Sequence, residues 1–312
     1  MNLNSNKVMV TGGSGMLGHA LSKYIPEAIF LSSNDCDLTS QPSCKKLFED
    51  IQPEYVIHLA ARVGGVKANN DFLGDFYREN VLINTNVLES SREYGVKKVL
   101  SMLSTCIYPD KVNYPLTEEQ IHNGEPHQSN YAYAFAKRML DVQSRAYRDQ
   151  FGCNYITAVA NNLFGENDNY HKDHSHVIPG MIRKMYEAKL NNGSVTLWSD
   201  GTPIREFTYS QDMAKIILFL MKNYEDKYPI NIGNTQQVSI LEIANKIADF
   251  IGFDGDVIWD TSKPKGQHKK PSDNSKLINL GWNQGDYTDL DFALQKSINW
   301  FTKNYSNYRG NI

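Results

Sequence analysis

The stretch Val8-Met9-Val10-Thr11-Gly12-Gly13-Ser14-Gly15-Met16-Leu17-Gly18 indicates a strand, a glycine-rich turn and a helix in immediate succession. Its first residues are apolar and partly β-branched, as in a buried strand, and a helical pattern continues to Tyr24. Glycines spaced as Gly12-x-x-Gly15-x-x-Gly18 let the backbone turn tightly, approach a pyrophosphate closely and pack the helix against the sheet. The pattern is common by itself, but a strand before it and a helix after it are the context that a dinucleotide site requires. The stretch therefore predicts the first unit of a dinucleotide-binding sheet.

Strands and helices alternate along the rest of the first half of the chain. We expect strands at residues 28–31, 55–61, 99–103 and 155–159, and helices at residues 40–51, 75–94 and 132–151. This alternation predicts an α/β fold with a doubly wound, parallel Rossmann sheet. From about Phe164 a polar loop follows, then helices over 178–190 and from near Ser239 and Thr288. We therefore expect a dinucleotide-binding domain over residues 1–165 and a smaller α/β substrate lobe over 166–312, with an approximate boundary that such chains often cross again.

The composition excludes several classes of protein. The chain has 312 residues, of which 41% are hydrophobic, and a formal net charge of -3, so it can build a core and offers no basic field for nucleic acid. No apolar run reaches the roughly 18 residues of a membrane span, and the polar start, residues 1–7, does not resemble a signal peptide. Cys36, Cys44, Cys106 and Cys153 lack Cys-x-x-Cys spacing, which is typical of reduced thiols in a cytosolic enzyme. We expect a cytoplasmic protein with no nucleic-acid partner and no membrane association.

The end of the second strand bears on the choice of cofactor. NAD enzymes usually carry an acidic residue there, which accepts a hydrogen bond from the ribose 2′-hydroxyl, but this chain has Ser32-Ser33-Asn34. Small hydroxyl side chains admit a 2′-phosphate, so NADP is favoured, although no Arg or Lys stands nearby to bind that phosphate. Asp35 and Asp37 follow closely and are typical of turn residues.

A phenol and an ammonium, those of Tyr133 and Lys137, are four residues apart in the helix expected over 132–151. Positions i and i+4 lie on one face of a helix, so Lys137 can lie beside whatever Tyr133 touches. Since a nearby cation favours the phenolate, we expect Lys137 to lower the pKa of Tyr133 toward the range of proton exchange with a carbonyl or alcohol oxygen. Ser104 ends the fourth strand, at the carboxyl edge where open parallel sheets bind their ligands.

These candidates also have purely structural interpretations. Ser104 can cap the end of a strand, Tyr133 can pack between helices, and Cys106 can be a core residue, because cysteine is among the most buried residue types.

The histidines are interpreted in the same way. His58 lies inside the third strand and is expected to be a satisfied core or sheet-edge histidine rather than a catalyst. The spacing His171-x-x-His174-x-His176 suggests a metal cluster, but no second pair of ligands is evident, so we expect no metal.

Taken together, the glycine turn, Ser104 and the Tyr133–Lys137 pair resemble the extended short-chain dehydrogenases/reductases. In that group the Ser and Tyr hydroxyls hydrogen-bond the reacting oxygen, the Tyr passes the proton, and the Lys orients the ribose and lowers the Tyr pKa. The resemblance implies these roles for Ser104, Tyr133 and Lys137.

Longer motifs resemble the GDP-L-fucose synthase family over nearly the whole chain. They are Val63-Gly64-Gly65, Ser104-Thr105-Cys106-Ile107-Tyr108-Pro109, Asn162-Leu163-Phe164-Gly165, Asp168-Asn169, His176-Val177-Ile178-Pro179 and Arg205-Glu206-Phe207. That family epimerises C3 and C5 of GDP-4-keto-6-deoxymannose and then reduces C4 with NADPH. Protons α to a ketone are acidic because the enolate spreads charge onto oxygen, so an epimerase needs a base and an acid. The resemblance implies that Cys106 is the base and His176 the acid.

The same resemblance implies two sets of ligand-binding residues. Those expected to bind NADPH/NADP are Gly12, Ser14, Gly15, Met16, Leu17, Gly18, Ser33, Asp37, Leu38, Ala60, Ala61, Leu103, Ser104, Tyr133, Lys137, Ala160, Asn162, Leu163 and His176. Those expected to bind the GDP-sugar are Lys184, Trp198, Arg205 and Lys265. An Arg can bind a pyrophosphate through two parallel hydrogen bonds, and a Trp offers a flat apolar wall.

Two of these positions depart from the family pattern. Relatives more often have Arg where Lys184 stands, so the charge is kept and the fork is lost. Relatives carry a substrate-contacting Asp where Lys265 stands, and this change of sign leaves the identity of the sugar open. Lys263, Lys265, Lys269 and Lys270 can alternatively form a solvated loop face, as surface lysines ordinarily do.

Three functions remain open at this point. The first is an NADPH-dependent C4 reductase of a GDP-4-keto sugar that also epimerises C3 and C5. The second is a dedicated C4 reductase of a related sugar such as a GDP-heptose, and the third is a cofactor-binding protein used for regulation or assembly. Relatives pair through the helices that correspond to residues 75–94 and 132–151, so we expect a homodimer.

Overall fold

A six-stranded sheet forms the centre of the computed structural model, which describes residues 1–263 and 267–310. All its neighbouring strands are parallel, which confirms the expected α/β Rossmann class. In spatial order its strands are β2 (Ile29–Leu31), β1 (Val8–Thr11), β3 (Tyr55–His58), β4 (Lys98–Ser104), β5 (Tyr155–Ala160) and β9 (Ile230–Ile232). The chain order of the strands reverses between β1 and β3. The crevice in which open α/β sheets bind ligands therefore lies at the carboxyl ends of these two strands.

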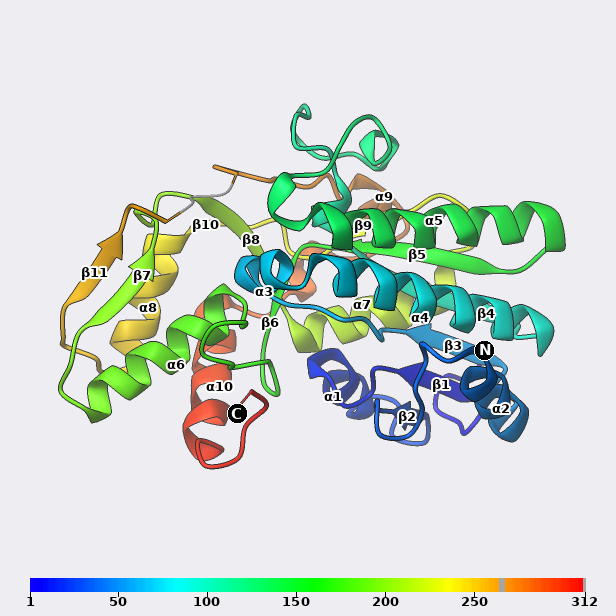
Figure 1. The fold of residues 1–312 in the computed structure, drawn as a ribbon, viewed down its shortest axis with the longest axis horizontal. Coiled ribbons are helices and arrows are strands. Elements are labelled where there is room, and N and C mark those ends of the chain that lie inside the picture. Colours follow the sequence, from blue (N-terminus) through cyan, green and yellow to red (C-terminus); the bar gives the residue numbers. More distant parts are fainter. Residues whose placement is uncertain (264–266, 311–312) are drawn as a thin grey trace.

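Helices cover both faces of this sheet (Figure 1). On one face lie α1 (Met16–Ser22) and α7 (Ser210–Asn223), and on the other lie α2 (Gln41–Ile51), α4 (Leu73–Glu93) and α5 (Tyr131–Phe151). Successive strand residues supply the two cores alternately, as the two-residue period of a strand requires. In β4, for example, Leu100 and Met102 join the α1–α7 core, whereas Val99 and Leu103 join the α2–α4–α5 core.

A second lobe has its own hydrophobic core and lies at one end of the sheet (Figure 1). Its helices are α6 (Val177–Leu190), α8 (Ile240–Ile251) and α10 (Leu290–Lys303). Its strands form a three-stranded sheet of β10 (Gln237–Ser239), β8 (Ile204–Tyr209) and β6 (Asn162–Phe164), and a parallel pair of β11 (Val257–Asp260) and β7 (Val195–Trp198). Two short helices, α3 (Val66–Asp71) and α9 (Ser275–Asn279), complete the set of α-helices in the described residues.

The chain passes between the two lobes more than once. After β6, residues up to 209 belong to the second lobe, but α7 and β9 return to the central sheet before α8 enters the second lobe again. Strand β9 pairs with β5, so residues from both halves of the sequence meet at the edge of the central sheet.

The third strand is shorter than expected. It ends at His58 rather than at residue 61, because its neighbour β1 ends at Thr11, where the chain turns away at Gly12 with a left-handed φ of 71°. His58 itself is buried and hydrogen-bonds Thr11 Oγ1 at 2.8 Å and Asn84 Oδ1 at 3.1 Å. Burial lowers its pKa to about 3, so the interpretation of a neutral, satisfied core histidine is confirmed.

Candidate active site

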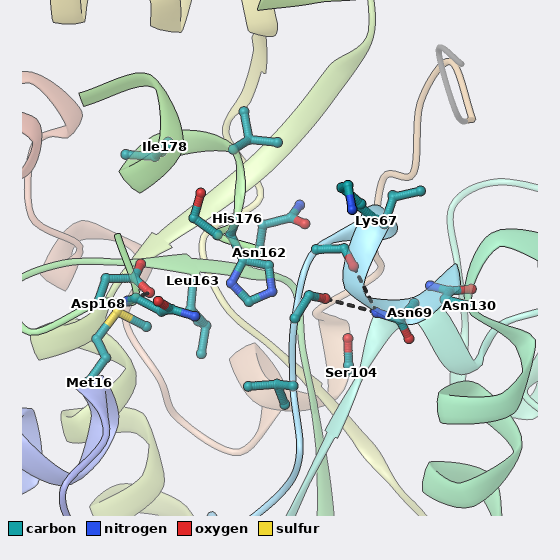
Figure 2. A pocket seen from close by; sticks show the side chains of 18 of the residues that line it. Met16, Lys67, Asn69, Ser104, Asn130, Asn162, Leu163, Asp168, His176 and Ile178 are labelled. Carbon is teal, nitrogen blue, oxygen red and sulfur yellow. Dashed lines mark hydrogen bonds between the residues drawn. The ribbon is translucent and has the colours of Figure 1, made fainter. Parts of the chain in front are cut away.

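A cavity of about 1670 Å³ runs from the crevice between β1 and β3 to the second lobe. It exceeds the roughly 300–1,000 Å³ of an ordinary small-molecule site, so it has room for a dinucleotide and a second ligand together. Figure 2 shows Met16, Leu163 and Asp168 on one side of it, Lys67, Asn69 and Asn130 on the other, and His176 between them.

The glycine turn forms one end of this cavity and has the shape that a dinucleotide needs. A Cβ at Gly12 would lie 2.8 Å from the Ala60 backbone nitrogen, so only glycine allows the turn to lie this close to the end of β3. Gly18 does not line the cavity; its Cα packs against Gly13, where any side chain would overlap the turn. Gly18 therefore shapes the site from beneath, as a helix-packing glycine, while Gly12 and Gly15 are open to a ligand.

The structure brings the other predicted cofactor residues to the same cavity. Those that line it are Ser14, Gly15, Met16, Leu17, Ser33, Asp37, Leu38, Ala60, Ala61, Leu103, Ser104, Tyr133, Lys137, Ala160, Asn162, Leu163 and His176. Most of them come from the carboxyl ends of β1 to β5 and from the segments that directly follow, which is the placement that a bound dinucleotide requires; Tyr133 and Lys137 come from α5, and His176 directly precedes α6.

Ser104, Tyr133 and Lys137 meet where β4 ends against α5. All three line the cavity, and the Lys137 ammonium, which is 3% exposed, donates a hydrogen bond of 2.9 Å to the Met102 carbonyl. Its nitrogen lies 6.0 Å from the centre of the Tyr133 ring. Burial lowers the pKa of Lys137 to about 8, because the protein replaces the water that would solvate its charge.

The expected effect of Lys137 on the Tyr133 pKa was wrong. Desolvation by burial raises the pKa of Tyr133 well above its ordinary value, and the neighbouring Cys106 thiol raises it further. The ammonium is directed to the Met102 carbonyl rather than to the phenol oxygen, so its charge does not offset the burial. Tyr133 is therefore held as a neutral phenol, which is the form that donates a proton.

Cys106 lies in a single 3₁₀ turn, Thr105–Ile107, directly after β4. Its backbone N–H donates to the Ser104 hydroxyl oxygen at 3.5 Å, and its 9% exposed side chain faces the cavity. Burial raises the pKa of the thiol, whereas the charges of Lys270 and Lys137 and the hydroxyl of Ser104 lower it. The side chain thus belongs to the core packed between β4 and α5 and at the same time lines the cavity, with the charges of Lys270 and Lys137 acting on its thiol.

The interpretation of the loop lysines as a solvated face was wrong for Lys270. Its half-buried side chain lines the cavity, its ammonium donates a 3.0 Å hydrogen bond to the Thr105 carbonyl, and desolvation lowers its pKa to about 8. Lys263 and Lys269 are exposed, as that interpretation expected, and Lys265 lies outside the described residues. A loop sequence carries no periodicity that separates one inward-pointing lysine from its solvated neighbours, so no sequence signal identified Lys270.

His176 precedes the first residue of α6 and points into the cavity (Figure 2). The surrounding protein desolvates its imidazolium and lowers its pKa, and the positive charge of Arg309 lowers it further. The ring is therefore neutral before a ligand binds, and an anionic ligand or intermediate beside it would favour the protonated form.

Two polar side chains of the cavity have buried atoms without a hydrogen-bond partner in the described residues. They are Asp168, through Oδ2, and Asn130, through Oδ1. Burial raises the pKa of the Asp168 carboxyl to about 7, although its other oxygen accepts a 2.7 Å hydrogen bond from the Asn169 N–H. From the sequence, Asp168 was noted only as part of a family motif, and Asn130 was not identified at all. No neighbouring residue in the sequence indicates that either side chain lines the cavity. Both residues line the cavity, and their two unpartnered atoms are exceptions to the rule that buried polar groups have a hydrogen-bond partner.

The predicted sugar-nucleotide residues lie in the second lobe and line the far end of the cavity. Lys184 on α6 donates to the Thr196 carbonyl at 3.2 Å, and Arg205 on β8 donates to the Ile204 carbonyl at 2.7 Å. Burial lowers the pKa of both side chains, and neither forms a salt bridge within the described part of the chain, so both charges are available to an anion. Trp198 is 42% exposed and presents its ring to the same space.

Metal ligands are not grouped anywhere in residues 1–263 and 267–310, where no cluster of three His, Cys, Asp or Glu side chains could hold an ion. His171 and His174 stack on each other with ring centres 4.5 Å apart. None of the helices in these residues has the length and apolar character that crossing a bilayer requires.

Comparisons with known proteins agree with this geometry. Residues 8–233 match the NAD dependent epimerase/dehydratase family. A GDP-L-fucose synthase of Dictyostelium discoideum is 44% identical over 97% of both chains.

Two solved structures extend the comparison to three dimensions. A GDP-L-fucose synthetase of Naegleria fowleri bound to NADP is 39% identical and superposes with a TM-score of 0.91, over 97% of this chain and 95% of that one. A GDP-6-OMe-4-keto-L-xylo-heptose reductase of C. jejuni also gives a TM-score of 0.91, at 28% identity over 97% and 99% of the two chains.

Proposed function

The chain belongs to the GDP-L-fucose synthase family, within the NAD dependent epimerase/dehydratase family, and we propose that this NADP-dependent oxidoreductase reduces the C4 keto group of a GDP-4-keto sugar after epimerising C3 and C5. GDP-4-keto-6-deoxymannose is the substrate that we propose first, and GDP-L-fucose is the corresponding product. An enzyme of this family uses its cofactor for chemistry, so the alternative of a purely regulatory binding protein is not retained.

One observation carries the proposal. The hydride-transfer group Ser104, Tyr133 and Lys137 and the thiol and imidazole of Cys106 and His176 line a single cavity that has room for two ligands. A reductase alone needs only the first group, whereas exchange of protons α to the ketone needs an additional base and acid.

We propose the following roles in reduction. Bound NADPH supplies the hydride that is delivered to C4. The Tyr133 phenol, kept neutral by burial, donates a proton to the C4 oxygen, and the Ser104 hydroxyl donates a hydrogen bond to the same oxygen. Lys137 holds the cofactor ribose and keeps positive charge at the end of β4, where negative charge develops on the substrate oxygen.

In epimerisation the Cys106 thiolate removes the proton α to the ketone. Burial disfavours that thiolate, but Lys270 and Lys137 act against the burial, so the base is formed in a cationic pocket. His176 then takes a proton from solvent and passes it to the enolate carbon. Its depressed pKa makes the imidazolium a ready donor once the anionic intermediate has favoured its protonation.

A dedicated C4 reductase of a GDP-heptose is the second candidate. The heptose reductase of C. jejuni superposes as well as the NADP-bound synthetase does, which supports this alternative, although its identity to this chain is lower. Lys184 and Lys265, where relatives carry Arg and Asp, also support a change at the sugar end of the cavity, with Lys265 outside the described residues.

The deciding experiment locates solvent hydrogen in the product. We would incubate the protein with NADPH and GDP-4-keto-6-deoxymannose in heavy water and read deuterium by NMR and mass spectrometry. Reduction with deuterium at both C3 and C5 is the expected result. Reduction without deuterium, or turnover only with a longer or already epimerised 4-keto sugar, would favour the dedicated reductase.

A Tyr133→Phe variant tests the proton donor separately. It should lose turnover and keep most of its affinity for NADPH, because the ring and its packing remain. A variant that reduces the substrate at nearly the parent rate would exclude Tyr133 as the acid.

We also propose a homodimer, and we propose that residues 1–165 bind most of the cofactor and residues 166–312 most of the sugar nucleotide, with His176 and Arg309 of the second part reaching the cofactor. Helices α4 and α5 pack together, and Tyr131, Met139 and Val142 are exposed on one face of α5 by their helical spacing. Light scattering should give a dimer for the parent and a monomer for Val142→Asp. A monomeric parent would refute this interface.

A further inference from the structure

The last described residues of the chain return to the cofactor end of the cavity. After α10, the Tyr308 ring is buried against Phe301 and Tyr170 and lies 5.4 Å below the Arg183 guanidinium. The Tyr170 N–H donates to the Arg309 carbonyl at 2.9 Å. Figure 1 shows this segment, in dark red, running from α10 toward α1.

The position after Arg309 is also restrained. The carbonyl of Gly310 accepts a hydrogen bond of 3.3 Å from Arg183, and Gly310 has a left-handed φ of 92°. Its Cα packs so closely against His171 that a side chain would overlap the backbone there. Backbone contacts on both sides therefore hold Arg309 in one place.

The side chain of Arg309 extends from this anchor over the glycine turn. It lines the cavity, and its Nη1 would be 3.6 Å from a Cβ placed on Gly15. The guanidinium is solvent-exposed and forms no hydrogen bond or salt bridge within residues 1–263 and 267–310. Five N–H donors are thus presented beside the part of the turn that is open to a ligand.

We propose that Arg309 is a cofactor-binding residue whose guanidinium holds the pyrophosphate of NADP(H) against the glycine turn. This assignment rests on NADP as the cofactor and does not depend on which GDP-sugar is reduced. A guanidinium matches two phosphate oxygens with parallel hydrogen bonds, and this chain has no other cation in the turn itself, Thr11 to Gly18.

The surroundings of Arg309 favour the cofactor over the sugar nucleotide. Its charge acts on Asp168 and His176, which line the cavity, and on His19, which follows the glycine turn in α1, whereas the cations among the predicted sugar-nucleotide residues are Lys184 and Arg205. Asp168 is close enough for Arg309 to lower its carboxyl pKa but forms no salt bridge with it, so the guanidinium remains free for a phosphate.

The test compares direct binding by Arg309→Gln, Arg309→Lys and the parent full-length chain. Calorimetry would give dissociation constants for NADP⁺, NAD⁺, ADP-ribose and GDP. Lys303→Gln, an exposed cation at the end of α10 outside the cavity lining, is the matched control for loss of one charge. Thermal unfolding without ligand would establish that the variants are equally folded.

Arg309→Gln should weaken NADP⁺, NAD⁺ and ADP-ribose alike, by roughly tenfold or more, because a charge-assisted pair to the shared pyrophosphate is lost. Arg309→Lys should recover part of the affinity, and Lys303→Gln and GDP binding should be unaffected. Unchanged NADP⁺ affinity would overturn the proposal. So would a loss confined to NADP⁺, which would place Arg309 at the 2′-phosphate, or a loss confined to GDP.

Discussion

Lys137 and Lys270 both contact the chain segment at the end of β4, and they reach it from different parts of the chain. Both line the cavity, Lys137 as a buried and Lys270 as a half-buried side chain. Each donates to a backbone carbonyl of that segment, Met102 or Thr105, and desolvation lowers each pKa to about 8. Their origins differ, because Lys137 belongs to α5 of the cofactor domain and Lys270 to a loop that comes from the second lobe. One of the two cations therefore belongs to the Rossmann sheet and its helices, whereas the other is supplied by the second lobe of the same chain.

A third cation completes this arrangement. Arg138, next to Lys137 on α5, donates at 2.6 Å to the Ile107 carbonyl and to the Gly124 carbonyl. The carbonyls of residues 102, 105 and 107 are therefore all held by cationic side chains, and the cavity-facing thiol lies among them. We expect Lys137 to serve mainly hydride transfer and Lys270 mainly the thiol.

Replacing Lys137 by Met should have the largest effect. The rate of C4 reduction at saturating NADPH should fall by about 10²–10³-fold, since both the orientation of the ribose and the positive charge near the substrate oxygen are lost. Stopped-flow oxidation of NADPH would measure it. Lys98→Met is the matched control, because Lys98 is an equally buried lysine bonded to the Tyr224 carbonyl at the opposite end of β4. Equal losses in the two variants would mean that Lys137 acts only through stability.

Cys106→Ser should separate the two half-reactions. A serine hydroxyl is a far weaker base than a thiolate, so deuterium exchange at the α carbons should fall by roughly 10²-fold, while reduction of an already epimerised 4-keto sugar continues. NMR of the recovered sugar would measure the exchange. The control is Cys153→Ser, because Cys153 does not line the cavity. This variant should catalyse deuterium exchange at the α carbons at the parent rate. Unchanged exchange in Cys106→Ser would remove Cys106 from the epimerisation.

Asp168 differs from the two lysines in its hydrogen bonding. Each lysine ammonium has a carbonyl acceptor, whereas one carboxyl oxygen of the buried Asp168 has no partner in the described residues. Its folded-state carboxyl pKa, about 7, is above the ordinary unfolded value. The protonated carboxyl therefore stabilises the fold fully below about pH 4, and this contribution is lost as the pH rises toward 7.

Asp168→Asn should flatten that pH dependence. We expect the free energy of unfolding of the parent to fall by about 3 kcal/mol more than that of the variant between pH 4 and 7. Urea unfolding of the ligand-free protein at several pH values would show it. The exposed Asp254→Asn is the control. Parallel curves for Asp168→Asn and the parent would mean that the carboxyl is ionised in the fold.

Lys270→Met should have the smallest effect and the most specific signature. Because the Lys270 charge lowers the Cys106 pKa, its removal raises that pKa, and the rise of deuterium exchange with pH should move to higher pH. Exchange should fall by roughly fivefold at neutral pH and recover at high pH, where the thiol ionises without help. The exposed neighbour Lys269→Met should leave the profile in place. A uniform loss at every pH would instead indicate a role in substrate binding.

Much of the fold could be predicted because its signals are local. The glycine turn, the alternating apolar runs and the Tyr133–Lys137 spacing each span fewer than about ten residues, and their geometry follows from the periods of strands and helices. The predicted catalytic residues accordingly meet at one cavity. Lys270, Asp168, Asn130 and Arg309 carried no such signal, because their burial or aim depends on which distant segment packs on them.

The sequence by itself determined the parallel Rossmann sheet, the dinucleotide turn and the family motifs, because backbone sterics and hydrophobic periodicity act between near neighbours. Only the tertiary structure decided the electrostatics of the site. It raised the Tyr133 pKa where a neighbouring lysine suggested the opposite, and it brought Lys270 from the other lobe to the Thr105 carbonyl. A pKa depends on how much water is excluded and on which charges lie within a few ångströms, and both are set by packing between segments that are not neighbours in the sequence.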